Sequence, residues 1–261
     1  MFDRSLYQIL WATTLPDPNP PTNSSEITIV PLTDGDIAVP NPLPDLPTGI
    51  TDNEIRPFAL EIKNNLVYVG LVTSGEDGGS MYGLVYAYDP ANLTFTKVLE
   101  FPLGYDRGCA LANTTLCIGP ADWNPWTDTY PTTPAMDAGA EHAHPQPILS
   151  DIEFDANGNM VIGLRDRFGD QTGYKVPRPN GNINLRTGDG FGDILLATLT
   201  GANSWTLDTT QFADHTYSIH ANGTTETELF FGGDYYIGAN DLHEETGSGG
   251  PVILPTKCGH F

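Results

Sequence analysis

The sequence is poor in basic residues, and this scarcity argues against negatively charged binding partners. Only 11 Lys and Arg residues accompany 33 Asp and Glu residues among 261, so the formal net charge is −22. A protein this negative repels phosphate backbones and anionic lipid head groups. We therefore expect no nucleic-acid partner. The charge is compatible with divalent cations and with an extracellular setting, or it serves solubility alone.

Long apolar runs and familiar catalytic motifs are also absent. No run approaches the roughly 20 residues that cross a bilayer, so the sequence predicts no membrane span. The start, Met1 to Trp11, has no basic region and too short an apolar stretch for a signal peptide. It is typical of a strand inside a fold, and we expect the chain to be a portion of a longer polypeptide. The nucleophile elbow, the phosphate-binding loop, the dinucleotide fingerprint and the zinc-protease motif do not occur.

Cysteine is scarce, with three residues in the chain. Cys109 and Cys117 are separated by eight positions, and a tight hairpin around Asn113 would bring them within disulfide range. We therefore predict a disulfide between them, with two free thiols as the alternative. Cys258 is left over near the end of the chain.

Glycine, proline and aromatic residues are abundant instead, and they favour β-structure. The 28 glycines and 22 prolines make long helices improbable, because both residues disfavour helix interiors. Aromatic residues reach 10 %, which suits the core of an all-β protein.

An internal repeat organises the chain. One copy begins with the apolar segments Ala59–Ile62 and Leu66–Leu71, and the other begins with Asp151–Phe154 and Met160–Leu164. Each pair is joined by an Asn-rich turn, which provides the positive φ angles that tight hairpins need. The second segment of each pair ends in Gly-Leu. Each copy thus predicts a β-hairpin.

Both copies continue with two more strands, at 83–89 and 94–101 in the first and at 192–198 and 204–207 in the second. Four antiparallel strands in sequence order are a β-propeller blade. We therefore predict an all-β fold, a β-propeller or partial propeller of four-stranded antiparallel blades. A single propeller-like domain is expected over residues 1–261, with a long irregular insertion at 104–147.

The predicted blades are incomplete at both ends of the chain. Leu6–Leu10 fits a third strand and Pro251–Leu254 fits a first strand, so too few strands are present for a comfortable ring. Open sheet edges recruit further strands. We expect the partner to be the rest of a parent polypeptide or further copies of this chain.

A resemblance to a known family rests on several motifs in a fixed order. They are Ile55–Leu60, Tyr105–Cys109, Trp123–Trp126, Pro145–Gly173 and His243–Glu245 with Gly249-Gly250. With these motifs the chain resembles, from about Leu6 to Leu254, the propeller-like region of large bacterial surface proteins that carry SdrD-type B-like repeats. The resemblance implies a secreted, cell-surface setting and implies no activity.

Four charged residues follow the predicted inner strand of the second copy: Arg165, Asp166, Arg167 and Asp170. Strand alternation places the two arginines on one face and Asp166 on the other. A salt-bridge network that joins neighbouring blades is one interpretation. A polar binding site at one mouth of the propeller is the alternative.

Metal and sugar sites each have a candidate set. The metal candidates are His142, His144, His243 and Glu244, because a His-x-His pair and a second acidic cluster suit a divalent metal. The Asp155–Asn159 turn is similar to a Ca²⁺ loop but lacks its glycine position, so a hairpin turn is favoured over calcium. Trp123 and Trp126 would stack on carbohydrate if exposed, or cap the core if buried.

Four sequons lie in predicted turns and loops, where a glycan is accommodated if the host attaches one. They are at Asn23, Asn92, Asn113 and Asn222.

The sequence as a whole favours a non-enzymatic protein of the cell surface or an extracellular appendage, with a rigid propeller scaffold for adhesion or assembly. The first alternative is a metal-assisted hydrolase or lyase acting on carbohydrate. The second is a subunit of an extracellular filament, completed by strands of its neighbours.

Overall fold

A computed structural model describes residues 43–51, 54–105, 122–131, 143–177, 185–188 and 190–210, and the backbone of several short strands outside these ranges. The chain divides into two units, Met1–Ala38 and Val39–Phe261, and every described residue belongs to the second.

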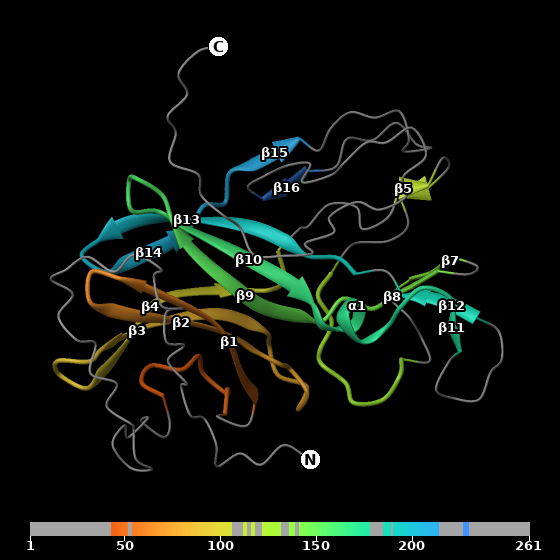
Figure 1. Cartoon of the computed structure of the whole chain (residues 1–261), viewed down its shortest axis with the longest axis horizontal. Coiled ribbons are helices and arrows are strands. Elements are labelled where there is room, and N and C mark those ends of the chain that lie inside the picture. The colour runs from red at the N-terminus through yellow and green to blue at the C-terminus, as the bar shows by residue number, and fades with distance from the viewer. Residues whose placement is uncertain are drawn as a thin grey trace, which may run out of the picture. The chain divides into compact units, whose positions relative to one another are not determined.

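The first sheet is a four-stranded antiparallel meander in sequence order (Figure 1). Its strands are β1 (Ile55–Lys63), β2 (Leu66–Thr73), β3 (Tyr82–Asp89) and β4 (Thr94–Pro102). Asn64 and Asn65 have φ angles of 51° and 63°, and they form the two-residue turn between β1 and β2. Asn tolerates this left-handed backbone, which explains why the turn predicted from sequence forms here.

The second sheet repeats this arrangement. Its strands are β9 (Pro147–Phe154), β10 (Met160–Asp166), β13 (Asp193–Gly201) and β14 (Ser204–Leu207), again antiparallel and in sequence order. The helix α1 (Arg167–Gln171) and the strands β11 (Val176–Pro177) and β12 (Leu185–Gly188) lie between β10 and β13 in the sequence. The predicted all-β class and the predicted pair of four-stranded repeats are therefore confirmed.

Strand register makes the two sheets equivalent residue by residue. Leu60 pairs with Val69 in the first sheet, as Ile152 pairs with Ile162 in the second. Val69 and Ile162, which lie on the second strand of their sheets, are each followed by Gly-Leu. We call the face that carries these four residues the front face of each sheet, and the opposite face the back face.

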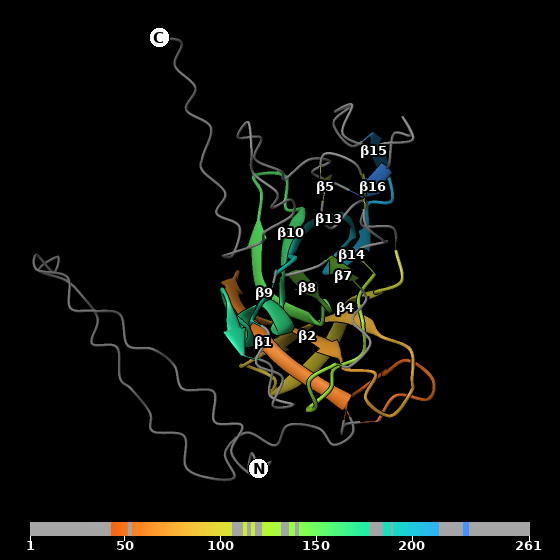
Figure 2. The same cartoon turned by 90° about the vertical axis from the view of Figure 1, so that its right-hand side faces the viewer.

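The two sheets pack with the back of the first against the front of the second. β1 lies against β9 and β4 lies against β14 (Figures 1 and 2). One buried cluster joins the sheets, with Tyr68, Val85 and Leu99 from the first and Ile152, Ile162 and Leu195 from the second. Burial of this apolar surface supplies the main stabilising free energy of the contact.

Gly70 is the point of closest approach between the sheets. A Cβ atom placed on Gly70 would lie 2.9 Å from Cδ1 of Ile152 and even closer to Cδ2 of Leu149. Glycine in the middle of a strand commonly marks such an approach. The Gly-Leu pair of the first repeat is therefore required by packing rather than by a turn.

A second, smaller cluster covers part of the front face of the first sheet. Leu43 and Leu46 pack there against Leu71 and Leu84. The hydroxyl of Tyr86 donates a hydrogen bond of 2.8 Å to the carbonyl of Pro44. The segment 43–46 thus shields β2 and β3.

The remaining strands are short. The pairs are β5 (Ala112–Asn113) with β6 (Leu116–Cys117), β7 (Met136–Ala138) with β8 (Glu141–Ala143), and β15 (Gln211–Ala213) with β16 (Thr227–Leu229). A third four-stranded sheet has the order β11-β12-β8-β7, and its β12–β8 pair is parallel. Within the described ranges no sheet closes on itself, and no helix is long and apolar enough to cross a membrane.

Candidate functional site

The polar residues of interest gather where loop 122–131 meets both sheets. The backbone N–H of Trp126 donates to the carbonyl of Ser74, which follows β2, at 2.9 Å. Its indole Nε1–H donates to the carbonyl of Pro147, the first residue of β9, at 2.8 Å. Trp126 therefore holds the loop to the first and the second sheet at once.

Two arginines approach the ring of Trp126 from different elements. The guanidinium carbon of Arg56, in β1, lies 5.4 Å from the ring centroid, and that of Arg167, in α1, lies 4.7 Å from it. Both distances are within the range of a cation–π interaction. We call Arg56, Glu76, Trp126, Asp128 and Arg167 the junction cluster.

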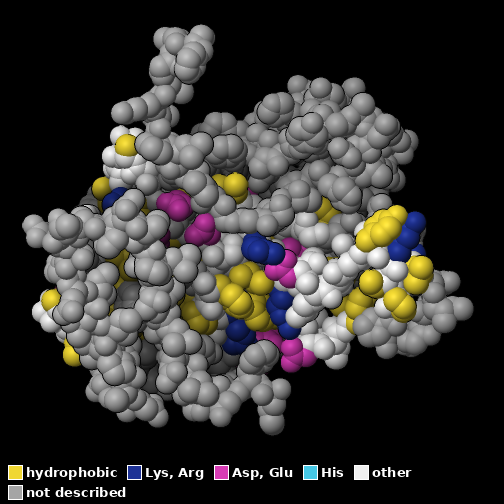
Figure 3. All heavy atoms as spheres, in the orientation of Figure 1, with side chains coloured by type: hydrophobic (Ala, Val, Ile, Leu, Met, Phe, Trp, Pro, Cys, Tyr) yellow, Lys and Arg dark blue, Asp and Glu magenta, His cyan; other side chains and the backbone are white. Residues whose placement is uncertain are grey.

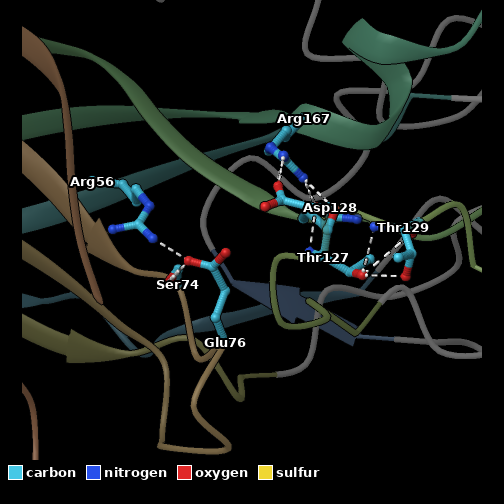
Figure 4. A network of polar contacts seen from close by, with 8 residues as sticks. Arg56, Ser74, Glu76, Thr127, Asp128, Thr129 and Arg167 are labelled. Carbon is cyan, nitrogen blue, oxygen red and sulfur yellow. Dashed lines mark hydrogen bonds and ion pairs between the residues drawn. The ribbon is translucent and has the colours of Figure 1, made fainter. Parts of the chain in front are cut away.

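Each arginine of the junction cluster also has a carboxylate partner (Figure 4). Arg56 forms an ion pair with Glu76, whose carboxylate also accepts a hydrogen bond of 2.7 Å from the Ser74 hydroxyl. Arg167 forms an ion pair of 3.2 Å with Asp128. Asp128 is largely exposed, so this pair contributes at most about 1 kcal/mol.

Arg167 makes stronger contacts to uncharged groups. Its Nη1 donates to the carbonyl of Thr127 at 2.9 Å and to Oε1 of Gln146 at 2.5 Å. Its backbone N–H donates to the carbonyl of Gln146 at 2.8 Å. Because these acceptors lie in the loop and just before β9, Arg167 holds three segments together.

The junction cluster borders exposed apolar surface. Phe58 of β1 is largely exposed, and its ring centroid lies 6.0 Å from that of Trp126. On the face of the molecule that Figure 3 shows, a group of apolar side chains is bordered by basic and acidic ones. The arrangement can hold a loop rigidly, and it presents a mixed apolar and charged surface.

A second polar network joins the sheets nearby. The hydroxyl of Tyr105, just after β4, donates to Oδ2 of Asp193 in β13 at 2.5 Å. The same hydroxyl accepts a hydrogen bond of 3.2 Å from Nε1 of Trp123. The two tryptophans of the loop therefore both take part in contacts that cross from one sheet to the other.

Asp166 lies at the end of β10 and is 4 % exposed. Its Oδ1 accepts hydrogen bonds from the backbone N–H groups of Gln146 and Phe168, at 2.9 and 2.8 Å. Its Oδ2 accepts one from the N–H of Phe191 at 3.3 Å. Asp166 is the N-cap of α1, and it ties together the entries to β9, α1 and β13.

The predicted set Arg165, Asp166, Arg167 and Asp170 is thus divided among three environments. Arg165 pairs with Asp170 at 2.5 Å, and both side chains are more than a third exposed. Asp166 is buried, and Arg167 belongs to the junction cluster. The contacts favour the network interpretation for Arg167, whereas a binding role for the set stays a prediction.

Trp123 and Trp126 are both buried, at 5 % and 9 % exposure, and both belong to the core cluster between the sheets. Stacking on a sugar needs an exposed ring face, so this burial favours the capping interpretation. Phe58, whose ring lies next to that of Trp126, is exposed.

The Asp155 turn is a β-hairpin. Oδ1 of Asp155 accepts hydrogen bonds of 2.8 Å from the N–H groups of Asn157 and Asn159, and Oδ2 accepts one from the Asn159 amide. Gly158 supplies a φ of 85°. Burial raises the pKa of Asp155, but the hydrogen bonds from Asn159 and Asn157 outweigh it and leave the pKa below its usual value. The predicted hairpin turn is therefore present, whereas calcium binding by this turn stays a prediction.

The predicted metal residues are only partly described. His144 is half-buried beside Phe168, and burial lowers its pKa. Among the described residues its Nδ1 has no hydrogen-bond partner. His142 lies in β8 with only its backbone described, and His243 and Glu244 lie outside the described residues. Among the residues whose side chains are described, no group of three or more metal-binding side chains comes together.

The disulfide and sequon predictions fall mostly outside the described part of the chain. Cys117 lies in β6, opposite Ala112 of β5, but Cys109 is not described, so the disulfide stays a prediction. Asn92 is exposed in the β3–β4 turn, where its amide donates to Asp89 at 2.7 Å. Asn113 lies in β5 with only its backbone described, and Asn23 and Asn222 are not described.

Sequence reasoning did not single out Arg56, Glu76 or Gln146. A signal for Arg56 was available, because an arginine at the start of a repeated strand is notable in a chain with 11 basic residues. Glu76 lies in a glycine-rich connection and Gln146 in a proline-flanked one, where no periodicity predicts a neighbour.

Comparison with known proteins gives two distant relatives, both from Dictyostelium discoideum. Colossin-A is 34 % identical over 119 residues, which are 46 % of this chain and 1 % of Colossin-A. Colossin-C is 28 % identical over 113 residues, which are 43 % of this chain and 10 % of Colossin-C. No family model and no solved structure matches. The chain is therefore similar to short stretches of much longer proteins.

Proposed function

We propose that this chain is a non-enzymatic, extracellular surface protein whose β-propeller is a rigid scaffold for adhesion or assembly. The observation that carries the proposal is the stacking of two equivalent sheets, back to front, with first strand against first strand and last against last. Neighbouring blades of a propeller stack in this way, with all sheets facing the same direction around an axis.

Rigidity follows from how the sheets are joined. The apolar cluster between them is continuous, and the junction cluster and the Tyr105–Asp193 contact add polar ties at the same boundary. Satisfied polar networks in a low-dielectric setting restrict motion and specify one arrangement. A scaffold that carries load between partners needs such fixed geometry.

The setting is supported by similarity and charge. The relatives that this chain matches are much longer proteins, which suits a module within a long polypeptide. The resemblance to large bacterial surface proteins implies a cell-surface location. A net charge of −22 keeps an extracellular protein soluble and away from anionic surfaces.

Surface labelling tests the proposal. Antibodies raised against the purified chain are applied to intact and to permeabilised cells that produce the protein, with a cytoplasmic protein as the control. We expect equal staining of intact and permeabilised cells, while the control stains only after permeabilisation. Staining that follows the control would contradict an extracellular role.

A further inference from the structure

The two repeats carry a polar side chain at the same place, at the end of the first hairpin of each sheet. Strand register makes Glu54 and Gln146 equivalent, because they directly precede β1 and β9. Ser74 and Arg167 are equivalent too, because they directly follow β2 and β10. The backbone N–H of Ser74 donates to the carbonyl of Glu54, and that of Arg167 donates to the carbonyl of Gln146, both at 2.8 Å. The two polar side chains therefore start from matching backbone positions.

In the second repeat the side-chain oxygen at this position meets a positive charge. Gln146 is 1 % exposed, and its Oε1 accepts hydrogen bonds from Nη1 of Arg167 at 2.5 Å and from the N–H of Thr127 at 3.3 Å. The equivalent position thus shows how this fold satisfies a buried oxygen here. A guanidinium from the residue after the second strand supplies the main contact.

In the first repeat the oxygen belongs to a carboxylate, and Ser74 brings no positive charge to it. Glu54 is 3 % exposed, and its Oε2 accepts a hydrogen bond of 3.3 Å from the N–H of Thr51. Its Oε1 has no hydrogen-bond partner among the described residues. The hydroxyl of Ser74 donates to Glu76 instead (Figure 4). Burying a carboxylate without a cation or a full set of hydrogen bonds is strongly unfavourable, so Glu54 requires a positive partner.

A glycine-rich loop, Ser74–Ser80, lies against this carboxylate and connects β2 to β3. A Cβ atom placed on Gly79 would lie 3.0 Å from Oε1 of Glu54, so the backbone of the loop lies next to the oxygen that has no partner. Residues 76–80 are exposed, and Glu76 and Asp77 add negative charge to the loop. The loop therefore provides backbone carbonyl groups and a field that attracts cations.

We propose that Glu54 and the loop Ser74–Ser80 bind a calcium ion, with Oε1 of Glu54 as its buried ligand. The ion supplies in the first repeat the positive charge that Arg167 supplies in the second. It is a metal ion rather than a side chain of a partner, because a carboxylate this deeply buried lies beyond the reach of a long side chain. The site goes beyond the scaffold function and does not depend on it.

The available ligands favour calcium over other metals. Among the described residues no group of three or more acidic, His or Cys side chains comes together, so the other ligands are carbonyl oxygens of the loop and water. Zinc prefers nitrogen and sulfur ligands, and Mg²⁺ requires a near-ideal octahedron. Ca²⁺ accepts carboxylate, carbonyl and water oxygens in flexible geometry, which a glycine-rich backbone can provide.

Amide hydrogen exchange of the purified chain, with and without Ca²⁺, tests the proposal and needs no substitution. Calcium modules of extracellular proteins have dissociation constants of about 10⁻⁴–10⁻³ M, so the titration extends to about ten times this range. We expect Ca²⁺ to slow exchange over residues 74–80 and to raise the melting temperature, because the ion binds only the folded state. Exchange in the Asp155–Asn159 turn should not change, and Mg²⁺ at the same concentration should have a smaller effect.

Glu54→Gln tests the role of the carboxylate, because the second repeat has glutamine at the equivalent position. The variant loses the buried carboxylate, so we expect a higher melting temperature than that of the parent in calcium-free buffer. Calorimetry should show calcium binding at least about tenfold weaker. Glu100→Gln is the matched control, because it removes the same charge from an exposed position in β4 and leaves calcium binding unchanged.

Two results would overturn the proposal. Unchanged exchange over residues 74–80 throughout the titration would show that Ca²⁺ does not bind at this loop. Equal calcium affinity of the parent and Glu54→Gln would assign the ion to other groups. If Glu54→Gln does not fold, the exchange experiment on the parent chain decides alone. Neither result changes the outcome of surface labelling, so failure here and failure of the scaffold function are distinguishable.

Discussion

Two residues, Asp166 and Trp126, each connect segments that are distant in the sequence. Asp166 does so through backbone N–H groups, and Trp126 through one backbone and one indole N–H. The residue types were visible in the sequence, and both were singled out. Their hydrogen-bond partners could not be predicted, because a backbone N–H at Phe191 or a backbone carbonyl at Ser74 is common to all residue types and leaves no pattern in the sequence. A charged or aromatic residue after a strand therefore predicts importance, and only the fold supplies the contacts.

Replacing Asp166 by Ala should destabilise the fold strongly. The change leaves the N–H groups of Gln146, Phe168 and Phe191 without their acceptor, and each buried unsatisfied donor costs about 1–3 kcal/mol. We expect a loss of at least about 3 kcal/mol in the free energy of unfolding, measured by urea denaturation. Asp166→Asn keeps one acceptor oxygen and is the control that should lose less. Equal, small losses for both would show that the carboxylate is dispensable.

His144 should make stability depend on pH. Burial lowers its pKa in the folded state from the ordinary value of 6.5, so the unfolded chain takes up a proton first as the pH falls. The unfolded state is thereby favoured, and the contribution of this residue to stability declines as the pH drops below 6.5 toward the folded pKa.

The matched variant is His144→Gln, which cannot take up the proton. We expect its melting temperature to fall less than that of the parent between pH 7.5 and pH 5.5. The same fall in both proteins would assign the pH dependence to other groups.

At the level of elements, the strands of the two repeats were predictable and the connections were not. Short apolar segments and Asn-rich turns identified the hairpins β1–β2 and β9–β10, because apolar runs and turn chemistry are local properties of the sequence. Loop 122–131 has no such period. Its conformation depends on Arg56, Arg167 and the carbonyls of two different sheets, and these come together only after the sheets pack.

Arg167 should therefore matter more to this loop than its neighbour Arg165. Arg167→Gln removes the hydrogen bonds to Thr127 and Gln146 and the contact with the Trp126 ring, and hydrogen bonds to charged groups contribute about 1.5–3 kcal/mol. We expect lower thermal stability, faster hydrogen exchange over residues 122–131, and red-shifted tryptophan emission.

Arg165→Gln is the control for this prediction, because its exposed ion pair with Asp170 contributes at most about 1 kcal/mol. If Arg165→Gln affects the loop as much as Arg167→Gln does, the ion pairs and not the junction cluster hold the loop.

At the scale of the whole molecule, the main feature is the contact between the two repeats, in which the back of the first sheet packs on the front of the second. The sequence predicts the number of strands in each repeat, and it marks Gly70 and Gly163 as equivalent. It does not reveal that the back of one sheet covers the front of the next, because strand alternation does not say which face meets which neighbour. The proposal on scaffold function follows from this contact.

A double-mutant cycle between Gly70 and Leu149 tests the contact most directly. A methyl group on Gly70 would collide with Cδ2 of Leu149 from the other sheet, and overpacking of this kind costs about 1–3 kcal/mol. Leu149→Ala alone leaves a cavity that costs about 2–5 kcal/mol. In the double variant the cavity receives the methyl group, so we expect a combined loss smaller than the sum by at least about 1 kcal/mol in urea denaturation.

The control pairs Gly70→Ala with Leu43→Ala, because Leu43 packs on the opposite face of the same sheet and should show additive losses. Favourable coupling for Gly70 with Leu149, together with additivity for Gly70 with Leu43, is the result that back-to-front stacking predicts. Additive losses for Gly70 with Leu149 would contradict it, because two sheets that stack at this point cannot respond independently there.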